Sequence, residues 1–216
     1  MMTMTTVVSD DHLRIERLQL GAFGTNAYLL VGKETGESAV VDAPDEAEKI
    51  IARLKGTTPL YILLTHSHMD HIGALGELCS ELKVPLAAHA ADSNALSPPP
   101  EIMLNQSDTI TLGKIQVYVL HTPGHTPGSL CFKTNNYLLS GDTLFPGGPG
   151  RTNTPADFAQ VVKSITGKLF TMDDDTQVYP GHGEPTTIKQ AKDEFAAFSS
   201  RPHRSDLCGD VLWLTS

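Results

Sequence analysis

A group of histidine and aspartate side chains follows directly on a predicted strand, and this arrangement constrains the chain more than any other feature. Residues 61–65 form an apolar run that leads into His66-Ser67-His68-Met69-Asp70-His71. Side chains at i and i+2 of an extended segment point the same way, so His66 and His68 can reach one ion. Asp70 and His71 follow where the chain turns, so they can face a second ion. Imidazole and carboxylate groups bind zinc, iron or manganese, and the segment therefore predicts a metal centre.

Three further residues of metal-ligand type lie on turns rich in glycine and proline. Each alone is typical of a cap or turn residue, and the first cluster alone also suits a polar loop in which Asp70 caps a helix. Taken together, they put ligand residues at strand ends, where binding sites are commonly built. They are His125 in the turn 122–128, Asp142 after the predicted strand 137–140, and His182 after the predicted strand 177–179.

Strand and helix signals alternate in the first half of the chain, and strands dominate the second half. The loop prediction covers residues 94–106, which contain three consecutive prolines. No internal repeat and no linker divides the chain, so one domain over residues 1–216 is expected, with two sheets and helices packed outside them. Helices are predicted at 44–54, 72–82, 157–169 and 184–198. Strands are predicted at 13–20, 25–31, 38–42, 61–65, 86–89, 109–112, 115–121, 129–133, 137–140 and 177–179.

The composition and the charge narrow the class of protein. The 216 residues are 40% hydrophobic and 19% charged, as is typical of globular chains. With a net charge of −9 and no visible basic face, no nucleic-acid partner is expected. Three widely separated cysteines without a C-x-x-C spacing suit a reducing compartment. No signal-peptide pattern and no membrane-spanning apolar run is present, so a soluble cytoplasmic protein with no membrane partner is expected.

The full set of these residues resembles the metallo-β-lactamase superfamily. The resemblance rests on His66-x-His68-x-Asp70-His71, His125, Asp142 and His182, together with Asp42 after an early β run. It implies an α+β fold, a four-layer αββα sandwich with a dinuclear site along one edge of the two sheets. It also implies that His66, His68 and His125 hold one metal, that Asp70, His71 and His182 hold the other, and that Asp142 bridges them. Asp42 would orient a ligand histidine from the second shell, although a turn role before Pro44 is the alternative.

A dinuclear centre of this kind predicts a hydrolase. Two divalent ions, with zinc expected and iron or manganese as alternatives, would activate a metal-bridging hydroxide for attack on a small thioester or ester. One ion would polarise the substrate oxygen, and Asp70 would be the catalytic residue that accepts or relays a proton. No serine or cysteine nucleophile is needed, and the expected partner is a small-molecule substrate.

Residues around Asp142 distinguish branches of the superfamily. An aspartate at this position speaks against the branch of lactamases with a cysteine there, and Gly141-Asp142-Thr143-Leu144-Phe145 is similar to glyoxalase II. Gly150-Arg151-Thr152-Asn153 is similar to short glyoxalase II-like proteins and to persulfide dioxygenases, in which an acid often replaces Asn153. Only residues 183–216 follow His182, so the usual glutathione clamp of glyoxalase II is not expected.

Two alternatives stay open beside the hydrolase. One is a mononuclear non-haem iron persulfide dioxygenase of the same fold, and the other is a binding or scaffold member without activity. Arg151 is predicted to bind a substrate carboxylate, and its alternative is a structural pair with an acidic side chain. The oligomeric state is open, with a homodimer allowed.

Overall fold

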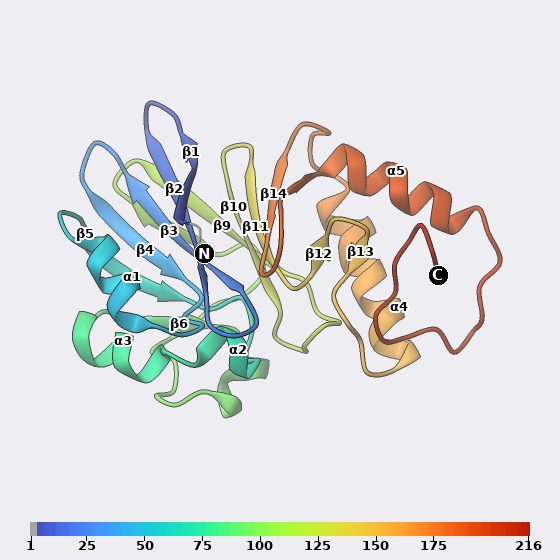
Figure 1. The fold of residues 1–216 in the computed structure, drawn as a ribbon, viewed down its shortest axis with the longest axis horizontal. Helices are drawn as coiled ribbons and strands as arrows, with labels where there is room; N and C mark the ends of the chain where they lie inside the picture. Colours follow the sequence, from blue (N-terminus) through green and yellow to red (C-terminus); the bar gives the residue numbers. More distant parts are fainter. Residues whose placement is uncertain (1–3) are drawn as a thin grey trace.

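Two β-sheets face each other, and helices cover the outer face of each. The computed structural model describes residues 4–216. The N-terminal segment, for which no signal peptide is predicted, begins with residues 1–3, and these lie outside the described residues. The ribbon in Figure 1 separates the helices of the N-terminal half from α4 and α5 near the C-terminus. This arrangement confirms the predicted αββα sandwich.

The first sheet contains seven strands in sequence order. The strands β1 to β4 are antiparallel neighbours, whereas β4, β5, β6 and β7 run parallel to one another. Parallel neighbours end at the same edge of a sheet, which brings the segments after β4 and β5 together. The strands are β1 (Met4–Ser9), β2 (Leu13–Leu20), β3 (Thr25–Gly32), β4 (Glu37–Val41), β5 (Thr58–Leu63), β6 (Leu86–Ala88) and β7 (Ile102–Met103).

The second sheet contains six strands in the order β15-β14-β11-β10-β9-β8, and a small hairpin of β12 and β13 lies beside it. Only β11 and β14 are parallel, so the segments that follow them also leave the sheet at one edge. The strands are β8 (Thr109–Leu112), β9 (Ile115–His121), β10 (Leu130–Thr134), β11 (Tyr137–Gly141), β12 (Leu144–Phe145), β13 (Gly148–Pro149), β14 (Gln177–Pro180) and β15 (Thr186–Thr187).

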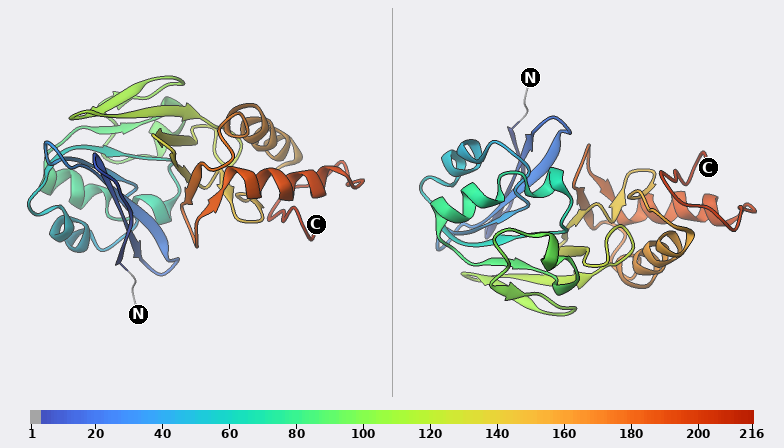
Figure 2. Two further views of the ribbon diagram at one scale, coloured as in Figure 1. Left: turned by 90° about the horizontal axis from the view of Figure 1, so that it is seen from above. Right: turned by 90° about the horizontal axis from the view of Figure 1, so that it is seen from below.

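Period-two alternation explains why these strands sit between two apolar layers. In β3 every residue is buried: Tyr28 and Leu30 point to the space between the sheets, while Ala27 and Leu29 point to the helices. The inner layer contains side chains from both sheets, and a separate apolar cluster lies under the helices of each half. The two views of Figure 2 show the sheets between these two sets of helices.

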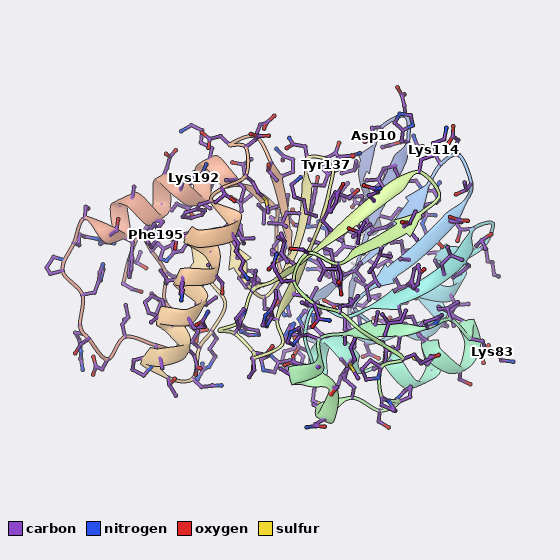
Figure 3. The ribbon with its side chains drawn as sticks, turned by 180° about the vertical axis from the view of Figure 1, so that it is seen from behind. Asp10, Lys83, Lys114, Tyr137, Lys192 and Phe195 are labelled. Atoms are coloured by element: carbon purple, nitrogen blue, oxygen red, sulfur yellow. The ribbon has the colours of Figure 1, made fainter. Side chains whose placement is uncertain are left out.

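Five helices and two short helical segments complete the fold of residues 4–216. Figure 3 marks Lys83, directly after α3, at one end of the molecule, and Lys192 and Phe195 on α5 at the other. Thr154 caps α4 in a capping box with Asp157, so this helix begins at Pro155, two residues before its predicted start. The helices are α1 (Ala47–Leu54), α2 (Met69–Ile72), α3 (Leu75–Leu82), η1 (Ala90–Ala95), α4 (Pro155–Ser164), the π-helical η2 (Ile165–Leu169) and α5 (Ile188–Ser199).

Several predicted boundaries were wrong. The helix expected from residue 44 begins at Ala47, because Glu46 has a left-handed backbone with φ of 54°. The last helix begins at Ile188 instead of residue 184, after Thr187 has capped it. The predicted loop 94–106 is partly ordered, since η1 reaches Ala95 and β7 pairs with β6. Within residues 4–216, none of the helices has the length and apolar character that a membrane span requires.

Candidate metal centre

The residues predicted to bind metal come together at one edge of the two sheets. Asp42 and His66 follow the parallel strands β4 and β5, and Asp142 and His182 follow the parallel strands β11 and β14. The amide of Leu130 donates to the carbonyl of Thr65 at 2.7 Å and ties the two sheets together there. His125 lies on the loop between β9 and β10. Fold topology therefore gathers side chains that are far apart in the sequence.

A first group of ligand atoms consists of three histidine nitrogens. The Nε2 atom of His66 lies 3.1 Å from Nδ1 of His68 and 3.2 Å from Nε2 of His125. His66 and His125 are buried, whereas His68 is exposed. The three nitrogens could bind one ion.

A second group consists of Asp70, His71 and His182. The Nε2 atom of His182 lies 3.1 Å from Oδ2 of Asp70 and 3.4 Å from Nε2 of His71. His71 is fully buried, and the side chains of Asp70 and His182 are 24% and 29% exposed. The short helix α2 begins at Met69 and turns Asp70 and His71 away from the extended segment that carries His66 and His68.

The carboxylate of Asp142 lies between the two groups. Its Oδ1 atom is 3.4 Å from Nε2 of His71, and its Oδ2 atom is 3.6 Å from Nε2 of both His125 and His182. Gly181 makes room for it, because a Cβ atom at this position would lie 2.2 Å from Oδ1 of Asp142. One carboxylate thus faces histidines of both groups.

Hydrogen bonds in the first group favour the tautomers in which Nε2 of His66 and Nε2 of His125 carry no proton and face each other. Thr65 Oγ1 donates to Asp42 Oδ2 at 2.7 Å, so it accepts from Nδ1 of His66 at 3.0 Å. The carbonyl oxygen of Arg151 accepts from Nδ1 of His125 at 2.8 Å. In the neutral rings, Nε2 of His66 and Nε2 of His125 therefore carry lone pairs, and two lone pairs 3.2 Å apart repel unless a cation lies between them.

The electrostatics around both groups also suit a cation. Burial disfavours a charged ring at His71, but the carboxylates of Asp42 and Asp142 outweigh it and raise the pKa of His71 to about 10. Burial and the charge of His71 hold the pKa of His66 well below its usual range. The Oδ1 atom of Asp142 is buried without a hydrogen-bond partner in the described chain. The residues present therefore fit divalent metal ions, which these ligand types prefer.

Asp42 connects the two groups from behind. Its Oδ1 atom accepts from the backbone amide of Thr65 at 2.8 Å. Its Oδ2 atom accepts from the Thr65 hydroxyl at 2.7 Å and from Nδ1 of His71 at 2.8 Å. Its backbone has a φ of 62°, in the left-handed region that aspartate tolerates better than most residues. The buried side chain of Asp42 therefore contacts the ring of His71 directly and supports His66 through the hydroxyl of Thr65.

Residues that the sequence did not point to hold the loop with His182. Arg17 Nη1 and Asn26 Nδ2 each donate to the carbonyl of Gly183 at 3.0 Å. The Tyr28 hydroxyl donates to the carbonyl of Pro180 at 2.7 Å. These donors lie on β2 and β3, more than 150 positions earlier in the chain. No local sequence signal identifies such partners.

A hollow of about 300 Å³ opens beside the metal-ligand groups and is lined by His125, Asp142 and His182. The β12–β13 hairpin, Gly150, Arg151 and the segment 210–212 also line it. The Nη1 atom of Arg151 pairs with Oδ2 of Asp210 at 2.8 Å. The observed pair has the geometry of the structural alternative for Arg151, yet both side chains are largely exposed and face the hollow.

A fold of this architecture with histidine and aspartate ligands at one sheet edge defines a metal-binding αββα protein. The model of the metallo-β-lactamase superfamily matches residues 20–182. The chain belongs to this superfamily, which includes metallo-hydrolases.

Curated relatives cover most of the chain. A probable metallo-hydrolase of Bacillus subtilis, YqgX, is 32% identical over 84% of this chain and 96% of its own length. The hydroxyacylglutathione hydrolase GloC of Haemophilus influenzae is 32% identical over 83% of this chain and 95% of its own length.

Solved structures show the same fold. The B3 metallo-β-lactamase BLEG-1 is 34% identical with a TM-score of 0.76, over 83% of this chain and 96% of that one. ETHE1 from Myxococcus xanthus is 26% identical with a TM-score of 0.75, over 82% of this chain and 81% of its own. TTHA1623 in a di-iron-bound form is 34% identical with a TM-score of 0.71, over 81% of this chain and 95% of its own.

Proposed function

We propose that this chain is a dinuclear metal-dependent hydrolase that acts on a small thioester or ester. The observation that carries the proposal is the pair of ligand groups joined by one carboxylate, because Asp142 lies within 3.6 Å of His71, His125 and His182. A single-ion site would not need a second group of ligand atoms at Asp70, His71 and His182. The likeness to a hydroxyacylglutathione hydrolase and to a di-iron protein supports both the reaction and the number of ions.

The residues divide between two metal positions. His66, His68 and His125 would hold one ion, Asp70, His71 and His182 would hold the other, and Asp142 would touch both. When bound, two divalent ions supply Lewis acidity toward a carbonyl oxygen and a water-derived nucleophile near neutral pH. Zinc is the metal we expect, and iron or manganese would fit the same ligands.

The protein's own part in the reaction is to orient these ligands and to move a proton. The Thr65 hydroxyl and the Arg151 carbonyl fix the rings of His66 and His125 with Nε2 inward. Asp70 is the residue we assign to proton transfer. Its side chain is partly open to solvent, and its Oδ2 atom lies 3.3 Å from the hydroxyl of Thr25, which donates to it. A carboxylate with one exposed side could accept the proton that the attacking water loses and pass it to the departing thiolate or alkoxide, which then leaves as a thiol or alcohol.

Arg151 is the residue we assign to the substrate. Arg151 lines the hollow beside the ligand groups, and its side chain is 67% exposed. Its partner Asp210 is exposed as well, and an exposed ion pair contributes only about 0–1 kcal/mol. A substrate carboxylate can therefore replace Asp210 at small cost.

Metal analysis together with turnover tests this function. We expect wild-type protein to bind two divalent ions per chain and to hydrolyse a hydroxyacyl-glutathione thioester. The double variant His66→Ala/His68→Ala should lose the first ion and at least about 10³-fold in kcat/KM, which corresponds to about 4 kcal/mol. His12→Ala, an exposed histidine on the turn before β2, serves as the control.

Two results would contradict the proposal. Undiminished thioester turnover in the double variant would exclude a role for the metal centre in hydrolysis. One iron per chain with oxygen uptake on glutathione persulfide, and no hydrolysis, would favour the mononuclear persulfide dioxygenase instead.

A further inference from the structure

A buried carboxylate outside the predicted ligand set joins two of the loops that carry the ligands. Asp92 lies in η1, which follows β6, and is 5% exposed. No lysine or arginine of residues 4–216 forms a salt bridge with it, and its partners are backbone amides and a hydroxyl. A buried charge is costly unless hydrogen bonds satisfy it, so this carboxylate depends on the loops around it, and they depend on it.

Its three donors belong to the two loops of the first ligand group. The amide of Ser67, between His66 and His68, donates to Oδ2 at 3.0 Å. The hydroxyl of Thr126, next to His125, donates to the same atom at 2.8 Å.

The amide of Gly128 donates to Oδ1 of Asp92 at 2.7 Å. A Cβ atom at residue 128 would lie 2.5 Å from Cγ and Oδ1 of Asp92, so only glycine lets the loop approach this closely. The two surfaces are therefore closely complementary, and the side chain of Asp92 bridges the loop after β5 and the loop before β10.

We propose that Asp92 is a positioning residue that sets the spacing between His66, His68 and His125, and with it the affinity of the first metal position alone. This inference rests on the proposed metal-dependent function. No hydrogen bond within residues 4–216 links Asp92 to Asp70, His71 or His182, whereas Asp42 contacts His71 directly. Outer-shell carboxylates of this kind typically change metal affinity by about 10–100-fold when they are replaced.

The replacement Asp92→Asn isolates this effect with little change in shape. An asparagine keeps one acceptor oxygen, but its amide group must face either the Gly128 amide or the donors from Ser67 and Thr126, which sets donor against donor. The matched control is Ser93→Ala, because the Ser93 hydroxyl donates to Ala90 within η1 and touches neither loop.

The experiment separates the two metal positions by using two backgrounds. His182→Ala weakens the second position and leaves the first to be measured, and His125→Ala does the reverse. Apoprotein is titrated with Zn²⁺ against a chromophoric chelator, and with Co²⁺ by its absorption spectrum. In the His182→Ala background, Asp92→Asn should weaken binding by about 10–100-fold, whereas in the His125→Ala background binding should stay within about twofold. Ser93→Ala should match its parent in both.

Equal losses in the two backgrounds, or no loss in the first, would overturn the positioning role. If Asp92→Asn does not fold, Thr126→Val removes one donor only and should cost up to about tenfold in the His182→Ala background, and no loss there would count against the proposal. A wild-type chain that binds no divalent ion would overturn the proposed function as well, whereas two bound ions that Asp92→Asn leaves unchanged would overturn this inference alone.

Discussion

The two ligand groups differ in how the protein holds them. In the first group, Nδ1 of His66 and Nδ1 of His125 donate to acceptors on the same or a neighbouring loop, and both rings are buried. In the second, His182 is 29% exposed, and its loop is held from outside by side chains of the β2–β3 hairpin. The first group is thus preorganised at His66 and His125, although His68 is exposed. In the second group His71 is fully buried and bonded to Asp42, so His182 is the ligand that we expect to adjust when substrate binds.

Two carboxylates cross this division. Asp142 faces histidines of both groups, and Asp42 supports His71 directly and His66 through the hydroxyl of Thr65. A change at Asp42 should therefore remove the difference between the groups, whereas a change in the hairpin should enlarge it.

Asp42→Asn is the change for which we expect the largest effect. Asp42 accepts three hydrogen bonds on two oxygens, and an asparagine amide would leave at least one buried donor of Thr65 or His71 unsatisfied. Metal affinity should fall by about 10–100-fold at both positions, and the metal-free protein should lose about 1–3 kcal/mol of unfolding free energy. Chelator competition and thermal unfolding measure the two effects.

The exposed Asp11→Asn is the control for this change, because it removes the same charge on the surface. A loss confined to the position of His71 would show that Thr65 does not transmit the support of Asp42 to His66.

Tyr28→Phe should have an intermediate effect and should act on the second group only. The variant loses the donor to the carbonyl of Pro180, but Asn26 still donates to that carbonyl at 3.0 Å. Because the carbonyl stays satisfied, we expect a loss of about 0.5–1.5 kcal/mol in unfolding free energy. The loop with His182 becomes less fixed, so zinc affinity at the second position should fall several-fold while the first position keeps its affinity.

Tyr179→Phe is a matched control for Tyr28→Phe. Its ring packs edge-on against Tyr28 with centroids 6.1 Å apart, and its hydroxyl lies 3.5 Å from the carbonyl of Val7, away from the loop of His182. Equal zinc affinities in the two phenylalanine variants would mean that the hydroxyl of Tyr28 does not position His182.

The sequence predicted the fold class, and it named the side chains that gather at the sheet edge. Both predictions rest on local signals, since His66 to His71 lie within six residues and His125, Asp142 and His182 stand beside glycines. The strand 13–20 was predicted with its observed bounds because apolar and polar residues alternate over 13–16 and again over 17–20.

The supports of these side chains could not be predicted in the same way. Asn26 and Tyr28 look like ordinary strand residues, and Asp92 looks like a loop acid, because their partners are fixed only when the sheets come together. Helix starts were missed for a different reason, since positive φ at Glu46 has no strong local signature. Long-range hydrogen bonds and single backbone angles are thus the parts of the centre that one sequence leaves open.

Asp210→Ala should give the smallest effect. It tests whether Arg151, in the hollow beside the metal centre, binds an anionic substrate. Its ion pair with Arg151 is exposed on both sides, so unfolding free energy should change by no more than about 1 kcal/mol. Removal of Asp210 frees the guanidinium of Arg151, and the KM for a thioester with a carboxylate should fall about two- to threefold at low salt. The KM for a neutral thioester should stay the same.

Glu34→Ala is the control for Asp210→Ala, because it breaks a comparable exposed pair with Lys114 and changes the net charge equally. If both variants lower the KM for the anionic thioester alike, the effect comes from overall charge and Arg151 has no special place in binding. If only Asp210→Ala does so, and Arg151→Ala raises the KM for the anionic thioester alone, then the C-terminal segment 210–212 takes part in selecting substrate in the hollow that His182 lines.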